Sequence, residues 1–216
     1  VALTTGTFFL TVSLKRLLTP AQLPVMSLPF ALTNVFFGVI GQNYDHLYQL
    51  GLLHQAGGIW GPEAVPEIIK GFCGAVSYVV FVNNFWVGLG IALLILWHSR
   101  LLFLAMAGSY GLGVALQALK IGAWHDAVIN PESYNYIYAG TLMAVVFLIP
   151  SITSLAMAAL TVLLSLVVYD GLVQGLKVWG IRPSALPFNL AVLVVMQGLI
   201  HYRSKWRNLH SGKTPE

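Results

Sequence analysis

Charged side chains are scarce in this chain of 216 residues. They make up 8% of the sequence, whereas hydrophobic residues make up 57% and aromatic residues 12%. A soluble domain of this length needs roughly a quarter of its residues charged to cover its surface. Helices that face lipid need almost none. The shortage therefore excludes an ordinary soluble protein and predicts an integral membrane protein whose main partner is the lipid bilayer.

Signatures of enzymes and of metal sites are also lacking. The single cysteine, Cys73, excludes a disulfide framework and a cysteine metal site within one chain. The sequence has no His-x-x-x-His pair, nucleotide-binding loop or Gly-x-Ser-x-Gly motif. We therefore predict that it is no enzyme and needs no metal or cofactor. The net charge of +4 comes from basic residues at the ends of apolar spans, so membrane topology explains it and we predict no nucleic-acid partner.

What the chain has instead is a series of apolar spans, which predicts an all-α membrane fold. Span 136–149 is too short to cross a hydrocarbon core of about 30 Å as a helix, so it is predicted to be re-entrant or broken. Span 71–97 is long enough to bend, and adjacent Asn83 and Asn84 mark the place. The seven spans are 1–14, 23–40, 71–97, 101–119, 136–149, 151–176 and 184–202.

One tripeptide occurs twice, as Leu28-Pro29-Phe30 and Leu186-Pro187-Phe188, each time opening an apolar run. This repetition predicts an internal duplication. If the span 136–149 is provisionally counted as one crossing, the second copy opens the fifth element after the first, so the two helices should run in opposite directions, as in an inverted repeat. The second repeat is predicted to start near Ile68, and its counterpart would lie before Val1. We therefore expect the first repeat to be truncated.

The predicted organisation follows from these spans. Residues 1–40 are the end of the first repeat, 41–67 an extramembrane loop, 68–202 the second repeat and 203–216 a basic tail.

Lys and Arg residues set the predicted orientation. Seven fall on one side of the membrane and four on the other, which places the first set, and with it the C-terminus, in the cytoplasm. A bacterial inner membrane is the expected location. The larger set is Lys15, Arg16, Arg100, Arg203, Lys205, Arg207 and Lys213, and the smaller is Lys70, Lys120, Lys177 and Arg182.

The stretch from Gln22 to Phe30 resembles the L-P-x-x-T-x-P-F signature of urea transporters, with Ser27 at the threonine position. The second copy keeps Pro-Phe-Asn-Leu at 187–190 but has Ala185 in place of the threonine. The segment 74–88 is similar to the opening segment of a repeat in that family. The resemblance covers about residues 15–200.

The resemblance implies a trimer with one pore per subunit, in which planar urea passes between aromatic faces and meets a ladder of hydrogen-bond acceptors. This chain departs from the pattern: Tyr78 replaces Gln or Glu, Phe85 replaces the proline of Asn-Pro, and Tyr138-Ala139 replaces Phe-Asn. The candidate residues of the pore are Ser27, Phe30, Tyr78, Phe81, Asn83, Asn84, Tyr138, Thr141 and Phe188.

Each candidate also has a purely structural interpretation. Prolines start helices, phenylalanines pack in cores, and a serine can bond to its own helix. Tyrosines can lie in the membrane interface, although the expected depth of Tyr78 and Tyr138 argues against this. The glycines of Gly171-x-x-x-Gly175 and the cluster Gly108, Gly111 and Gly113 are predicted to allow close helix packing.

Three functions remain open. The first is a channel or facilitator for a small polar solute, urea or urea-like. The second is a membrane subunit of a redox complex, because flavin-carrying subunits of Rnf and sodium-pumping quinone reductase complexes share the urea transporter architecture. They attach flavin through a threonine, and here only Ala139-Gly140-Thr141 is similar, without the leading serine. The third is a non-transporting subunit of a larger membrane complex.

Overall fold

A computed structural model describes the chain except residues 1, 42–61, 81 and 202–216. The described part is built from helices and contains no strand. It divides into two compact units, one formed by Val1–Gln55 with Val167–Trp206 and the other largely by Ala56–Leu166. The prediction of an all-α fold is confirmed.

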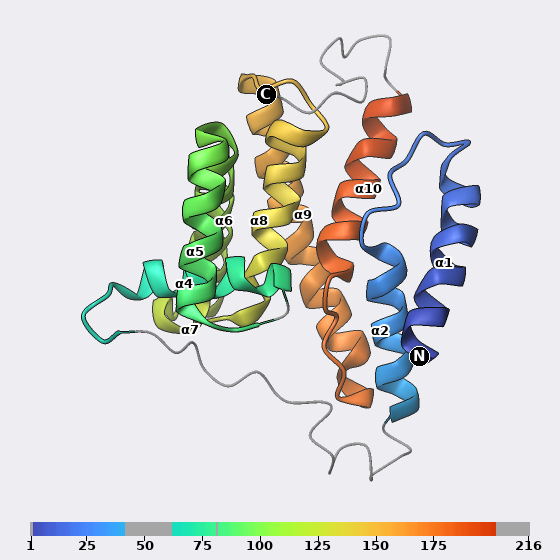
Figure 1. Cartoon of the computed structure of the whole chain (residues 1–216), viewed down its shortest axis with the longest axis horizontal. Helices are drawn as coiled ribbons and strands as arrows, with labels where there is room; N and C mark the ends of the chain where they lie inside the picture. Colours follow the sequence, from blue (N-terminus) through green and yellow to red (C-terminus); the bar gives the residue numbers. More distant parts are fainter. Residues whose placement is uncertain (1, 42–61, 81, 202–216) are drawn as a thin grey trace. The chain divides into compact units, whose positions relative to one another are not determined.

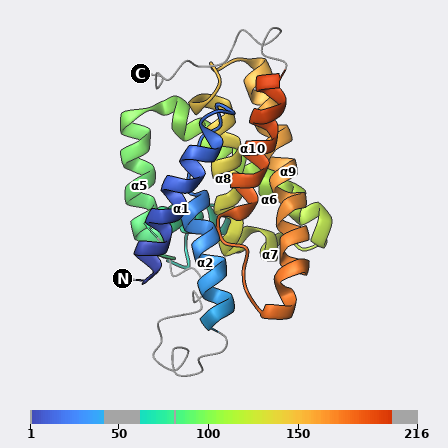
Figure 2. The same ribbon diagram turned by 90° about the vertical axis from the view of Figure 1, so that its right-hand side faces the viewer.

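The first unit contains helices from both ends of the chain. Helix α1 covers Ala2–Leu18, α2 covers Leu28–Gly41 and α10 covers Leu186–His201. The last part of α9 (Ile152–Leu176) and the short helix η4 (Lys177–Trp179) complete it. Figures 1 and 2 show the starts of α2 and α10 next to each other at a similar level, from which the two helices run in opposite directions. The predicted inversion of the two Leu-Pro-Phe helices is therefore confirmed.

The two Leu-Pro-Phe copies share their backbone conformation. Three residues before each proline the chain turns left-handed, at Met26 with φ 48° and at Ser184 with φ 51°. The amide of each leucine then donates to a carbonyl three residues back, Leu28 to Val25 at 3.3 Å and Leu186 to Pro183 at 3.1 Å. Left-handed backbone is uncommon outside glycine. Its recurrence at the same place indicates that the duplicated motif is one structural device.

This turn also corrects a predicted boundary. The second apolar span was predicted to start at residue 23, whereas α2 begins at Leu28. The backbone of Met26 is left-handed, and Pro24 lacks the amide hydrogen that a helix interior needs. Residues 23–27 therefore form an extended segment and a turn ahead of the helix.

The second unit begins with α4 (Glu67–Ser77), η1 (Tyr78–Val80) and α5 (Phe85–His98). The chain is non-helical at Asn83 and Asn84, so the bend predicted there is confirmed. Helix α6 (Arg100–Ile121) follows, and α7 (Trp124–Val128) and η2 (Pro131–Ser133) lead to α8. The first part of α9 closes the unit.

The short span predicted at 136–149 is one short helix that changes from α to π. Helix α8 covers Tyr134–Thr141 and passes into a π-helix, η3, at Leu142–Val146. At a rise of 1.5 Å per residue the two pieces together reach only about 20 Å, less than a hydrocarbon core. The helix stops ahead of Pro150, which cannot continue it. The helix is therefore too short to span a hydrocarbon core, and the prediction that the segment is re-entrant or broken in the membrane stays a prediction.

Two helices in the described part are long and apolar enough to cross a membrane, Arg100–Ile121 and Ile152–Trp179. Shorter apolar helices cover Leu28–Ile40, Phe85–His98 and Leu186–His201. The domain boundaries predicted at 40, 67 and 202 stay predictions. Most of the predicted loop 41–67 and all of the tail 203–216 lie outside the described residues.

Gly113 is the predicted packing glycine for which the described residues show a close contact. A Cβ on Gly113 of α6 would run into the ring of Tyr136 on α8, so this glycine permits the α6–α8 contact. A Cβ added at Gly108, Gly111, Gly171 or Gly175 would meet nothing within 4 Å among the described residues, so close packing at these four stays a prediction. Spacing of glycines alone does not tell which face of a helix meets a neighbour.

An exposed ion pair joins the start of α4 to α7. His125 Nδ1 lies 3.1 Å from each carboxylate oxygen of Glu67. The hydrogen bond to Glu67 and its charge raise the pKa of His125 above its usual 6.5, with a smaller contribution from Asp126. A raised pKa means that the pair stabilises the fold fully below pH 6.5 and loses this effect as pH rises through the folded-state pKa.

We therefore expect Glu67→Gln to lower the melting temperature in detergent more at pH 5.5 than at pH 8.5. Because both side chains are exposed, the difference should be small. His125→Gln is the matched variant and should remove the same pH dependence. An equal effect of Glu67→Gln at both pH values would contradict the assignment.

Candidate functional site

The predicted pore residues fall into a group in each unit, and each group is described separately. In the first unit, the starts of α2 and α10 meet through a hydrogen bond between the two repeats. Asn189 Nδ2 donates to Ser27 Oγ at 2.9 Å and to its own helix at Ala185 O, at 2.6 Å. Ser27 stands just before the first Leu-Pro-Phe and Asn189 just after the second. We call Ser27, Phe30, Phe188 and Asn189 the helix-start cluster.

Burial differs among the members of this cluster. Phe188 is 4% exposed and Asn189 is completely buried, whereas Ser27 and Phe30 are half-buried. Thr33 turns its hydroxyl back to the carbonyl of Pro29 at 2.7 Å, so this buried polar group is satisfied within α2. Ser27 and Phe30 thus keep exposed surface, whereas Phe188 and Asn189 are enclosed by the protein.

The helix termini give this cluster its electrostatic character. Two helix N-termini begin here, and each carries a partial positive charge from unpaired amide groups. Such a potential favours an anion or the oxygen end of a neutral dipole and disfavours a cation. Helix N-termini that meet at a repeat interface are typical of solute sites in transporters.

The second unit brings together two of the predicted tyrosines and adds a third. Tyr78 on η1 stacks on Tyr134 at the start of α8, with ring centroids 5.3 Å apart and an interplanar angle of 24°. Tyr134 meets Tyr138 one turn later edge-to-face, at 6.2 Å and 74°. This tyrosine cluster provides aromatic faces together with phenol hydroxyls, in a segment where the family resemblance implies phenylalanine and an amide.

Asn84 has a defined structural task. Its Oδ1 accepts hydrogen bonds from Trp86 N at 2.9 Å and Val87 N at 3.2 Å, which makes it the N-cap of α5. Its backbone amide donates to the hydroxyl of buried Ser77 at 3.1 Å. The carboxamide oxygen is therefore engaged in holding the break between α4 and α5.

The remaining predicted residues of the second unit differ in placement. Asn83 is half-buried beside the N-cap, whereas Thr141 is 7% exposed near the end of α8. The hydroxyl of Thr141 is buried, with no hydrogen-bond partner among the described residues. Phe81 lies outside the described residues.

The start of α8 is fixed by a buried polar pair. Asn135 Nδ2 donates to the carbonyl of Glu132 at 3.0 Å and lies 3.4 Å from its carboxylate oxygen Oε2. Asn130 accepts from Glu132 N at 3.0 Å and so caps η2. These bonds hold the first turn of the helix that carries Tyr134 and Tyr138.

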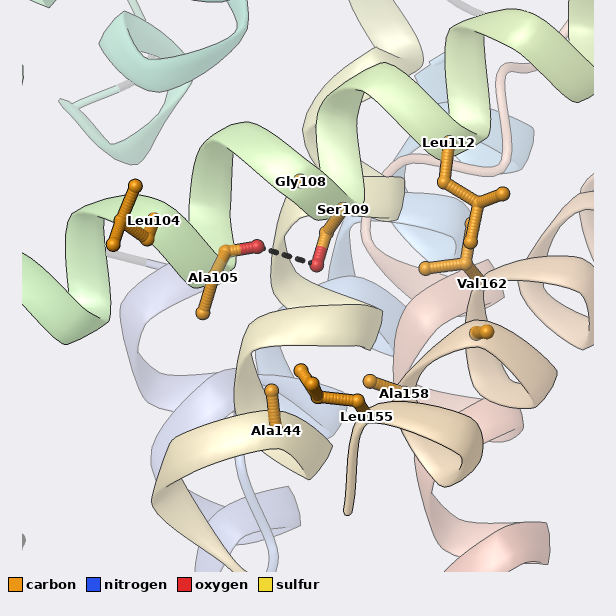
Figure 3. Close-up of a pocket in the computed structure, with 10 residues that line it drawn as sticks. Leu104, Ala105, Gly108, Ser109, Leu112, Ala144, Leu155, Ala158 and Val162 are labelled. Carbon is orange, nitrogen blue, oxygen red and sulfur yellow. Dashed lines mark hydrogen bonds between the residues drawn. The ribbon is translucent and has the colours of Figure 1, made fainter. Parts of the chain in front are cut away.

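An apolar hollow of about 180 Å³ lies elsewhere in the second unit, between α6, η3 and α9 (Figure 3). Its one hydroxyl, on Ser109, donates to Ala105 O of the same helix at 2.7 Å. None of the predicted pore residues line it, and its surface suits hydrocarbon better than a polar solute. The lining residues are Leu104, Ala105, Gly108, Ser109, Leu112, Ala144, Leu155, Ala158, Ala159 and Val162.

Sequence reasoning missed two residues of these clusters. Tyr134 lies four positions before Tyr138, a spacing that places both on one face of a helix. Asn189 is the polar residue of the second Leu-Pro-Phe copy, at the position where the first copy has Ala31. Comparing the two copies for polar residues after the proline as well as before it could have found Asn189.

Comparison with known families decides the affiliation. The profile of the family described as "Urea transporter" matches residues 1–199. The chain belongs to the urea transporter family. Membership makes it a membrane transport protein of an all-helical, non-enzymatic channel family. A comparison with curated proteins finds no match.

Proposed function

We propose that this chain forms a pore for the passive passage of a small neutral polar solute, urea or a urea-like amide, at the interface of its inverted repeats. The hydrogen bond between Ser27 and Asn189 carries the proposal, because it joins the two Leu-Pro-Phe helix starts. It places polar side chains from both repeats at the level where α2 and α10 begin, as a path for a polar solute along the repeat interface would need.

The chemistry of the helix-start cluster suits such a solute. The Ser27 hydroxyl supplies a polar contact for an edge of a planar molecule, and the half-buried ring of Phe30 supplies a face for it. Phe188, which is buried, is proposed as a pore residue on the strength of the family resemblance. The positive ends of α2 and α10 disfavour cations and favour the oxygen end of a neutral solute. Tyr78, Tyr138, Phe81, Asn83 and Thr141 are proposed as further pore residues on the strength of the family resemblance.

The assembly and location are proposals as well. Family resemblance supports a homotrimer with one pore per subunit, in a bacterial inner membrane with the C-terminus in the cytoplasm.

Burial of the Thr141 hydroxyl argues against attachment of flavin at that residue, because a bulky group would need open space around the oxygen. A non-transporting subunit of a membrane complex is the alternative that the flux experiment addresses.

Proteoliposomes that contain the protein should shrink and recover in a urea gradient faster than empty liposomes, as followed by stopped-flow light scattering. We expect Ser27→Ala to lower this urea flux roughly two- to tenfold, the effect of losing one hydrogen bond worth about 0.5–1.5 kcal/mol.

Ser13→Ala provides a matched control, because Ser13 is an exposed hydroxyl on α1. Its flux should equal that of the original protein. Flux of the original protein no faster than empty liposomes would refute the pore and favour a non-transporting subunit.

A further inference from the structure

The completely buried side chain of Asn189 has one polar atom without a hydrogen-bond partner among the described residues. Both hydrogen bonds that it makes come from Nδ2, to Ser27 Oγ and to Ala185 O. Its carbonyl oxygen Oδ1 is buried and has no donor within hydrogen-bond distance among the described residues. A buried acceptor without a donor costs about 1–3 kcal/mol. Such an atom in a native structure requires an explanation, commonly a water or a ligand.

The orientation of this carboxamide is fixed by its neighbours. If the amide were turned over, Oδ1 would face the carbonyl oxygen of Ala185, which cannot donate a hydrogen bond. Nδ2 must therefore point to Ala185 and Ser27, and Oδ1 must be the acceptor that is left open.

Ser27 supplies the complementary group. Its oxygen accepts from Asn189, and within the described residues its own proton has no recorded acceptor. From the bond lengths of a carboxamide, Oδ1 of Asn189 lies at most about 5.5 Å from Ser27 Oγ. One free donor and one free acceptor at this separation match a molecule that carries a carbonyl oxygen and an N–H on the same carbon.

We propose that Asn189 is a solute-contacting residue that selects for N–H groups: Oδ1 accepts from the N–H of a small neutral amide while the Ser27 hydroxyl donates to its carbonyl oxygen. This inference rests on the pore proposed above and adds its second recognition group. Position 189 thereby explains why the two copies of the motif differ. The first copy contributes the hydroxyl at Ser27 and the second the amide at Asn189, whereas Ala185 and Ala31 stand at the equivalent positions.

The test compares flux of urea and of thiourea in proteoliposomes. Asn189→Leu removes the amide at similar size, and Asn189→Ala introduces the residue that the first copy carries at its buried position 31. Either variant should lower urea flux about five- to tenfold. Both solutes carry N–H groups, so Asn189→Ala should slow them by a similar factor. Ser27→Ala should slow urea more than thiourea, because a thiocarbonyl sulfur is the weaker acceptor.

Gln197→Leu is the matched control, since it removes an exposed amide from the same helix and should leave both fluxes unchanged. Melting temperature and size-exclusion profile establish that each variant is folded, and Asn189→Ala serves if Asn189→Leu is not. Urea flux in folded Asn189→Ala equal to that of Gln197→Leu would overturn the inference and leave the pore standing. Absence of flux in the original protein would overturn both.

Discussion

Replacing Gly88 by alanine is expected to prevent correct folding of the second unit. A Cβ at Gly88 of α5 would meet the backbone carbonyl of Cys73 on α4, closer than any real contact allows. The obstacle is backbone rather than a flexible side chain, so the two helices would have to separate. Overpacking of a tight core costs about 1–3 kcal/mol and occasionally more, and here a whole helix crossing would be displaced.

Gly90→Ala is the matched control for this prediction. Gly90 lies on the same helix, and nothing stands within 4 Å of a Cβ added there. Size-exclusion chromatography in detergent and thermal unfolding should show a loss of monodisperse protein, or a clearly lower melting temperature, for Gly88→Ala alone. Equal behaviour of the two variants would mean that α4 and α5 do not cross at Gly88.

The sequence reveals periodic and repeated features, but it does not reveal which helix faces pack against each other. Doubling of Leu-Pro-Phe, the break at Asn83-Asn84 and the short element after residue 134 were all predictable, because proline, paired amides and length act locally. The crossing at Gly88 was not, since Gly88 and Gly90 lie in equally apolar surroundings along the sequence. Only tertiary packing distinguishes a glycine that admits a neighbour from one that faces open space.

The candidate site shows the same division. Ser27, Phe30 and Phe188 were predictable because each belongs to the repeated motif. Asn189 belongs to it too, but its importance depends on a hydrogen bond to a residue 162 positions away. Tyr78 and Tyr138 were predicted separately, whereas Tyr134 between them became visible only as the ring that contacts both. The Ser27–Asn189 hydrogen bond and the Tyr78–Tyr134 stacking join residues far apart in the sequence, so neither contact leaves a periodic pattern.

Replacement of Asn84 by leucine is the second change from which we expect a large effect. The stability of this variant decides how its urea flux is interpreted. We expect Asn84→Leu to destabilise the protein, because the amides of Trp86 and Val87 would lose their acceptor at the start of α5. Loss of an N-cap costs about 0.5–2 kcal/mol in water. The cost rises to several kcal/mol where lipid replaces water around the freed groups.

Asn84→Asp separates capping from solute contact. A carboxylate accepts from the same two amides and is favoured by the positive end of α5, so this variant should keep a melting temperature near that of the original protein. Asn34→Leu, an exposed amide removed from α2, is the control for the change of residue type. If Asn84→Leu melts like Asn34→Leu, the cap contributes little. If it melts much lower, a loss of urea flux in that variant reflects the broken turn between α4 and α5. In that case only flux measured in folded Asn84→Asp reports on a contact between residue 84 and the solute.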